Sequence, residues 1–124
     1  MTVYLVDMVR NCTRACRVAW SLGVGRVVLV GDTPAPERWH LYSARGLEIL
    51  RAADFPADVL VLEVNGRTRV EDVNWGGISG VAVGGPAVQF GRRILARNPS
   101  ARIVSRQPCL TGDQALAVAL YARR

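Results

Sequence analysis

The 124-residue sequence predicts an α/β fold with a mostly parallel sheet flanked by helices. Short apolar runs rich in β-branched residues recur along the chain, and stretches with helical apolar spacing alternate with them. Half of the residues are hydrophobic and 21% are charged, as is usual for one compact domain. Because no repeat, low-complexity tract or composition boundary interrupts the pattern, we expect residues 1–124 to form a single domain.

The first three elements follow from apolar spacing and stop signals. Residues 2–6 have the pattern of a short strand, and the apolar residues of 10–22 recur at helical spacing until Gly23 ends the helix. Residues 26–30 are a β-branched run of the kind that is buried on both faces of a parallel sheet.

The middle of the chain is less regular. After a turn with two prolines, residues 43–53 are predicted to be a helix, because Leu47 and Leu50 lie three positions apart. Residues 58–64 form another buried strand. Residues 67–75 are polar and mixed, which predicts a connection with at most a short helix.

The last third returns to clear alternation. We expect a fourth central strand at 78–83, a helix at 87–97, a short strand at 101–105 and an alanine-rich closing helix at 112–123.

The composition excludes several chemistries. All sixteen basic residues are arginine, so a Walker-type phosphate loop and Schiff-base catalysis lack their lysine. One histidine, His40, cannot build a two-histidine zinc site, and no nucleophile-elbow spacing surrounds it. Hydrolase chemistry and a metal site are therefore not expected.

The net charge of +6 favours an anionic partner, with nucleic acid first and a membrane surface second. No secretory signal or membrane-length apolar run is recognisable, so we expect a cytoplasmic protein with reduced thiols. Cys12 and Cys16 lie one helical turn apart and could suggest a metal pair, although small residues packing within the core is the favoured interpretation.

Three places at predicted strand ends could carry chemistry, and the first is the junction that opens the first helix. Asn11 could cap that helix. Arg14 and Arg17 lie three apart, so they form either a solvated face or a cationic rim that grips phosphate and stabilises developing negative charge.

The second place is Gly84-Gly85-Pro86, which is either a simple turn or a point where a ligand approaches the backbone. The third precedes the last helix, where Thr111 or Asp113 can cap the helix or its free amides can receive polar ligand atoms.

Taken in order, these places resemble the TrmH-like branch of the SPOUT superfamily of RNA methyltransferases. The first motif is Asn11 followed six residues later by Arg17, with Ala19 two further on and Gly23-Val24 closing the run. The middle and end resemble the branch as well, in residues 61–64, 73–75 and 81–85, in 103–104 and 109–117, and in Tyr121.

The resemblance implies a C-terminal trefoil knot and a homodimer whose active sites lie at the subunit interface. It further implies that S-adenosylmethionine is bound among the knot loops. The cofactor contacts that it implies are Val64, Gly84, Ile103, Cys109, Leu110 and Thr111.

For the reaction, the resemblance implies ribose 2′-O-methylation of tRNA or rRNA. Arg17 would be the catalytic arginine, supported by Asn11. With no metal or histidine base required, the composition agrees with this chemistry. The candidates for contacts to the RNA backbone are Arg10, Arg14, Arg92, Arg93 and Arg97.

Three positions depart from the family pattern. Pro86 replaces a glutamate, Thr111 replaces an asparagine and Cys109 replaces a serine. One alternative is therefore a SPOUT-like protein that binds RNA or assists assembly without methylating. Another is an unrelated flavodoxin-like or Rossmann-like domain.

Overall fold

The computed structural model describes residues 1–84, 90–104 and 110–123. In chain order, the elements are β1 (Thr2–Val6), α1 (Cys12–Ser21), β2 (Arg26–Val30), α2 (Trp39–Ala44), β3 (Glu48–Ala52), β4 (Val59–Leu62), β5 (Thr68–Arg69), the 3₁₀ turn η1 (Val70–Asp72), β6 (Gly80–Gly84), α3 (Arg92–Arg97), β7 (Ser100–Arg102) and α4 (Gly112–Ala122).

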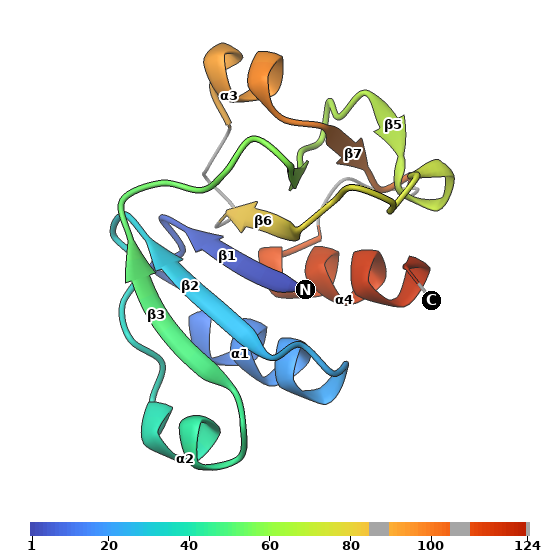
Figure 1. Ribbon diagram of the computed structural model, residues 1–124. Helices are drawn as coiled ribbons and strands as arrows, with labels where there is room; N and C mark the ends of the chain where they lie inside the picture. Colours follow the sequence, from blue (N-terminus) through green and yellow to red (C-terminus); the bar gives the residue numbers. More distant parts are fainter. Residues whose placement is uncertain (85–89, 105–109, 124) are drawn as a thin grey trace.

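The strands form one parallel sheet in the order β3-β2-β1-β6-β4-β7-β5 (Figure 1). The predicted α/β class with a parallel sheet is confirmed. Val3 of the central strand β1 aligns with Val27 of β2 and Val81 of β6. From β1 the chain adds β2 and β3 on one side of the sheet, and it then places all later strands on the other side of β1. The direction in which strands are added therefore reverses between β1 and β6. In open parallel sheets, ligands bind at such a point, outside the carboxyl ends of the strands.

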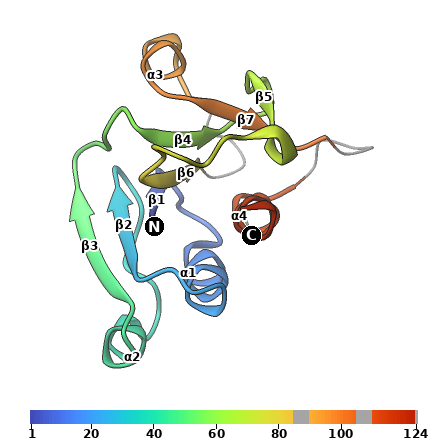
Figure 2. The same ribbon diagram turned by 45° about the vertical axis from the view of Figure 1, so that its right-hand side comes forward.

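Helices α1 and α4 cover one face of the sheet and pack against each other, whereas α3 covers the opposite face (Figures 1 and 2). The larger core lies on the α1–α4 side and includes Leu5, Leu60 and Leu116, all essentially inaccessible to solvent. A smaller core on the α3 side centres on Phe55 and Phe90, whose ring centroids are 6.2 Å apart. Packing on both faces explains why the central strands are apolar throughout.

The helix predicted over residues 43–53 is wrong. Helix α2 ends at Ala44, and Glu48–Ala52 is the edge strand β3. Gly46 adopts a φ of 92°, and the Leu47 N–H donates to the Tyr42 carbonyl, so the chain leaves the helix there. The three-residue spacing of the leucines was misleading, because Leu47 is buried before the strand begins and Leu50 is exposed within it.

Several element ends differ from expectation. The polar connection contains the two-residue strand β5 and a 3₁₀ turn, and the strand expected at 101–105 is observed as Ser100–Arg102. The helix expected at 87–97 begins at Arg92 in the described chain, while residues 87–89 and 105 lie outside it. The described residues do not show the trefoil knot, which stays a prediction.

No described helix is both long enough and apolar enough to cross a membrane.

Candidate active site

The junction between β1 and α1 is built on two residues with left-handed backbone conformations. Asp7 has a φ of 46° and Asn11 has a φ of 65°, values that residues other than glycine rarely adopt. The Asp7 N–H donates to the Val30 carbonyl, and the Asp7 carboxylate accepts a 2.9 Å hydrogen bond from the Asp32 N–H. Unusual backbone held by surrounding hydrogen bonds is characteristic of functional sites.

Thr33 fastens this junction to the loop that follows β2. Thr33 is 1% exposed, and its hydroxyl accepts a hydrogen bond from the Met8 N–H at 3.0 Å. The hydroxyl proton can be donated to the carbonyl of Leu5, 2.8 Å away, or to that of Val30, 2.9 Å away.

Arg51 of β3 secures the same loop from its other side. Its guanidinium donates to the carbonyl of Gly31 at 3.2 Å and to the carbonyl of Thr33 at 2.7 Å. Gly31 has a φ of 65°, which favours glycine, and a Cβ there would displace the Asp7 carboxylate. The carboxyl ends of three neighbouring strands are thus joined into one support.

An open hollow of about 530 Å³ lies above this support. The two loops and the first turns of α1 line it with Val9, Asn11, Cys12, Thr13, Arg14, Arg17, Pro34, Ala35 and Glu37. Two guanidinium groups and an amide around one hollow suit an anionic or phosphorylated ligand. Arg14 and Arg17 thus line one hollow together with the Glu37 carboxylate, and their role as a cationic rim stays a prediction.

Asn11 was expected to cap helix α1 with its side chain, and that expectation is wrong. Asn11 occupies the N-cap position, but its side chain makes no capping hydrogen bond. Its left-handed backbone replaces the extended conformation that side-chain capping requires. The amide is therefore available to the hollow that it lines.

The two helix cysteines are buried, as expected for packing residues. The Cys12 thiol contacts the Pro34 carbonyl at 3.2 Å. A hydrogen bond from the Cys16 thiol lowers the pKa of Cys12, and the same bond together with burial raises the pKa of Cys16. Among the described residues, no group of three or more histidine, cysteine or acidic side chains could hold a metal ion.

Three of the described residues predicted to contact the cofactor share one edge of the sheet. Gly84 ends β6, Val64 follows β4 and Ile103 follows β7, and these three strands are neighbours. The Glu63 N–H donates to the Ala101 carbonyl, which keeps the chain leaving β4 beside β7.

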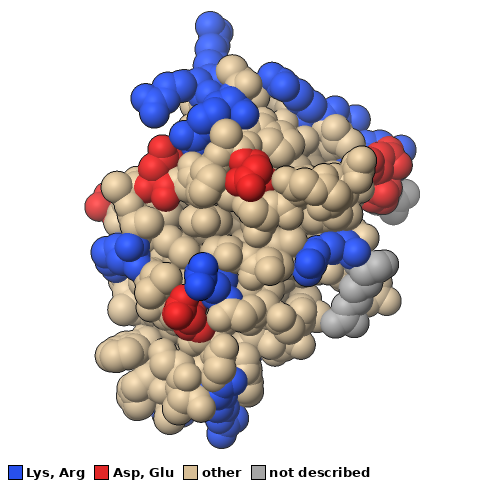
Figure 3. Space-filling view, in the orientation of Figure 1, with Lys and Arg blue, Asp and Glu red and all other residues tan. Residues whose placement is uncertain are grey.

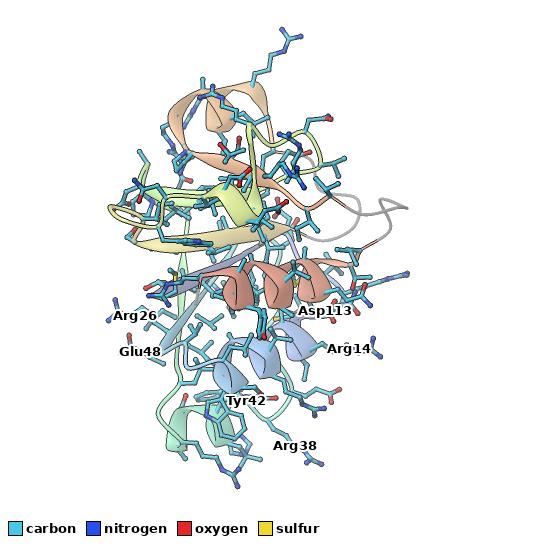
Figure 4. The ribbon with its side chains drawn as sticks, turned by 90° about the vertical axis from the view of Figure 1, so that its right-hand side faces the viewer. Arg14, Arg26, Arg38, Tyr42, Glu48 and Asp113 are labelled. Carbon is cyan, nitrogen blue, oxygen red and sulfur yellow. The ribbon has the colours of Figure 1, made fainter. Side chains whose placement is uncertain are left out.

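Gly112 brings the start of α4 to the same edge. A Cβ at this position would overlap with the carbonyl oxygen of Gly84 and would lie 2.7 Å from the Met8 methyl group. Met8 therefore links the β1–α1 junction, with Asn11 and Arg17, to the edge that carries Gly84. Figure 4 shows Arg14 of α1 and Asp113 of α4 on the same side of the molecule.

Thr111 is the N-cap residue of α4, as predicted. Its N–H donates to the Gln114 side chain at 3.1 Å, and its hydroxyl donates to the Asp113 carboxylate at 2.6 Å. Leu110, which precedes it, is 40% exposed. The expected contact at Cys109 lies outside the described residues.

Glu63 was not predicted as a site residue from the sequence. It lies at the end of β4, and its carboxylate accepts a hydrogen bond from the Phe90 N–H at 3.2 Å. The position of a carboxylate just after a buried strand was the available signal.

The candidate RNA contacts divide into two groups. Arg10, Arg14, Arg92 and Arg93 are exposed. Arg97 is instead engaged within the protein, because its guanidinium lies 3.1 Å from the Asp54 carboxylate and 5.3 Å from the centroid of the Phe55 ring.

No protein-family model and no curated protein matches the sequence. Solved structures do match it. A putative RNA methyltransferase of the TrmH family from Porphyromonas gingivalis superposes with a TM-score of 0.80 at 13% identity, over 99% of this chain and 58% of that one. An rRNA methyltransferase from Sinorhizobium meliloti superposes with a TM-score of 0.78 at 20% identity, over 98% and 54%.

The chain has the TrmH/SpoU fold. The resemblance read from the motifs is thus confirmed as a fold, and the unrelated flavodoxin-like or Rossmann-like alternative is wrong. The chain spans about half the length of the first structures that it matches. A structure described as giving insights into 2-OH methylation of C/U34 on tRNA is covered over 86% of its length, at a TM-score of 0.75 and 18% identity. The rRNA methyltransferase from Sinorhizobium meliloti has also been solved with AdoMet bound.

Proposed function

We propose that the protein is an S-adenosylmethionine-dependent methyltransferase that modifies a ribose 2′-hydroxyl of tRNA or rRNA. The observation that carries this proposal is the joint placement of Asn11 and Arg17 in one hollow, linked through Met8 to the edge that carries Gly84. An RNA 2′-O ribose methyltransferase is among the proteins that share the fold.

Arg17 is suited to activating the ribose 2′-hydroxyl for attack on the methyl group. A ribose hydroxyl is a weak nucleophile, and negative charge develops on its oxygen as its proton leaves. A guanidinium fixed nearby stabilises that charge and can also grip an adjacent phosphate. Arg17 is exposed within the hollow and has no side-chain hydrogen bond or ion pair to another described residue. The Asn11 amide offers both a donor and an acceptor to orient the same ribose.

The residues at the sheet edge suit the cofactor. S-adenosylmethionine supplies, when bound, an already activated methyl group on a sulfonium. Val64 and Val104 are 69% and 59% exposed, and they follow neighbouring strands, so they present an apolar surface for an adenosine. We assign cofactor contact to Val64, Gly84, Ile103, Cys109, Leu110 and Thr111.

We further propose that two copies of the chain form the working enzyme. Helix α4 exposes Val118 and Tyr121, the latter by 70% of its surface, which supports an interface on this helix.

The deciding experiment is a calorimetric titration of the purified protein with S-adenosylmethionine and with its demethylated product. We expect micromolar binding at about one site per chain, followed by methyl transfer to ribose in unfractionated tRNA or rRNA. Absence of binding by either compound would overturn the enzymatic proposal.

A non-catalytic RNA-binding or assembly protein is the second candidate. It is favoured by the Thr111 hydroxyl, which donates to Asp113, and by Pro86 at a position where the family has glutamate. Tight RNA binding without cofactor binding would select this function.

A further inference from the structure

A concentration of arginines lies away from the hollow, on the half of the sheet beyond β6. Figure 3 shows basic side chains gathered over α3 and along the β5–β7 side of the molecule. We call this the α3–β7 basic surface, and it consists of Arg67, Arg69, Arg92, Arg93 and Arg102.

The arginines on the strand side are held close together. Arg69 and Arg102 are register partners on the neighbouring strands β5 and β7. Arg102 also donates to the carbonyls of Gly66 and Arg67, at 2.8 and 3.1 Å, which fixes its guanidinium beside Arg67. These contacts place three arginines of the surface on one short stretch of the sheet edge.

Much of this charge has no acidic partner in the protein. All ten acidic side chains belong to described residues, yet within the described chain only Arg69 of the surface pairs with one, Glu71 at 2.6 Å. Arg67, Arg92 and Arg93 are exposed and make no ion pair with any of the ten.

The surface adjoins the edge to which we assigned the cofactor. The Phe90 N–H bonds to the Glu63 carboxylate, which holds the start of α3 near the end of β4 and near Val64. Arg102 ends β7, which neighbours β4. The hollow and the α3–β7 basic surface thus lie on either side of the sheet edge that carries Gly84 and Val64. An RNA backbone that enters the hollow can therefore continue over this edge to the basic surface.

We propose that the α3–β7 basic surface binds the phosphate backbone of RNA that flanks the methylated nucleotide. This inference rests on the proposed function. Guanidinium forks match phosphate geometry, and phosphate contacts fix register without reading sequence. No large exposed apolar side chain among the described residues lies on α3, β5 or β7, so the surface lacks the apolar anchors of a membrane-binding or protein-binding face.

The test compares two variants that lose equal charge. The first carries Arg67→Gln, Arg92→Gln and Arg93→Gln. The control carries Arg26→Gln, Arg38→Gln and Arg45→Gln on the β2–α2 side, where Figure 4 labels the first two residues. Binding of unfractionated tRNA is measured by fluorescence anisotropy from 50 to 300 mM KCl, without cofactor, alongside binding to phosphatidylserine vesicles.

Each phosphate contact contributes about 0.7 to 0.9 to the slope of log K against log salt. The first variant should therefore lower the tRNA slope by about two to three, and the control should keep the wild-type slope. An unchanged slope in the first variant, an equal loss in the control, or a loss confined to vesicles would overturn the inference, as would a wild-type protein that does not bind tRNA. If the first variant loses tRNA affinity while the wild type never methylates RNA, the surface stands and the proposed activity fails.

Discussion

The backbone N–H of Met8 donates to the buried hydroxyl of Thr33 across 25 positions of sequence, at 3.0 Å. This bond joins the loop that carries Asn11 to the loop that follows β2, and both loops line the candidate active site. The geometry of the hollow therefore depends on a residue that is itself outside it.

Replacing Thr33 by valine should lower the free energy of unfolding by about 1–3 kcal/mol, because a buried N–H loses its acceptor while the side-chain volume is kept. Urea denaturation measures the change. Thr13→Val is the matched control, since the Thr13 hydroxyl accepts a bond from the exposed Glu37 N–H that water can replace. Equal stability of the two variants would contradict the assigned role of Thr33.

Gly112→Ala should destabilise the protein, although alanine favours helices by about 1 kcal/mol over glycine. The added methyl group would collide with the carbonyl of Gly84 and crowd Met8. We expect a loss of about 1–3 kcal/mol in unfolding free energy and weaker binding of S-adenosylmethionine.

Gly25→Ala is the control for this change, because a Cβ there meets nothing within 4 Å. It should leave stability unchanged or raise it by up to about 1 kcal/mol. A Gly112→Ala protein of wild-type stability and cofactor affinity would show that the start of α4 is not fixed against β6.

Local patterns were sufficient to predict the buried strands and the first motif. Residues 2–6 and 26–30 were predicted with their observed bounds, since each is a short apolar run whose hydrogen bonds lie in the sheet. The residues of the hollow at Asn11, Arg14 and Arg17 could be found because they lie at a strand-to-helix junction, where spacing along the chain fixes their common side.

The supporting residues could not be found in that way. Thr33 bonds to a residue 28 positions away, Arg51 to one 18 away and Glu63 to one 27 away. No local spacing encodes such contacts. The edge strand β3 was missed for a related reason, because an edge strand lacks continuous burial and Gly46 was included in a helix instead of ending it.

Stability should fall in acid through the Asp54–Arg97 pair. The hydrogen bond from Arg97, with a further one from the Phe55 N–H, lowers the pKa of the Asp54 carboxyl in the folded protein. A lowered folded-state pKa means that the stabilisation is present above the unfolded value, about 3.9, and is lost as the pH falls through the folded value.

Because Asp54 is about half exposed, we expect a contribution of at most about 1 kcal/mol. Asp54→Asn should reduce stability at pH 7 and flatten its decline below pH 4, as followed by thermal unfolding across pH. A variant whose acid sensitivity equals that of the wild type would assign the decline to other carboxylates.

Arg17→Ala should lower single-turnover methyl transfer to RNA by about 10²–10³-fold, the usual cost of removing one group that stabilises developing charge. Because Arg17 is exposed on α1, the free energy of unfolding should stay within about 0.5 kcal/mol of the wild type. Affinity for S-adenosylmethionine should also be kept, since the residues assigned to the cofactor lie beyond Met8.

Arg17→Lys retains the charge without the planar fork and should be intermediate in rate. Arg14→Ala, one turn earlier on the same rim, should weaken RNA binding more than it slows the chemical step. Wild-type turnover by Arg17→Ala with intact RNA binding would remove this arginine from the reaction and leave it a phosphate contact only.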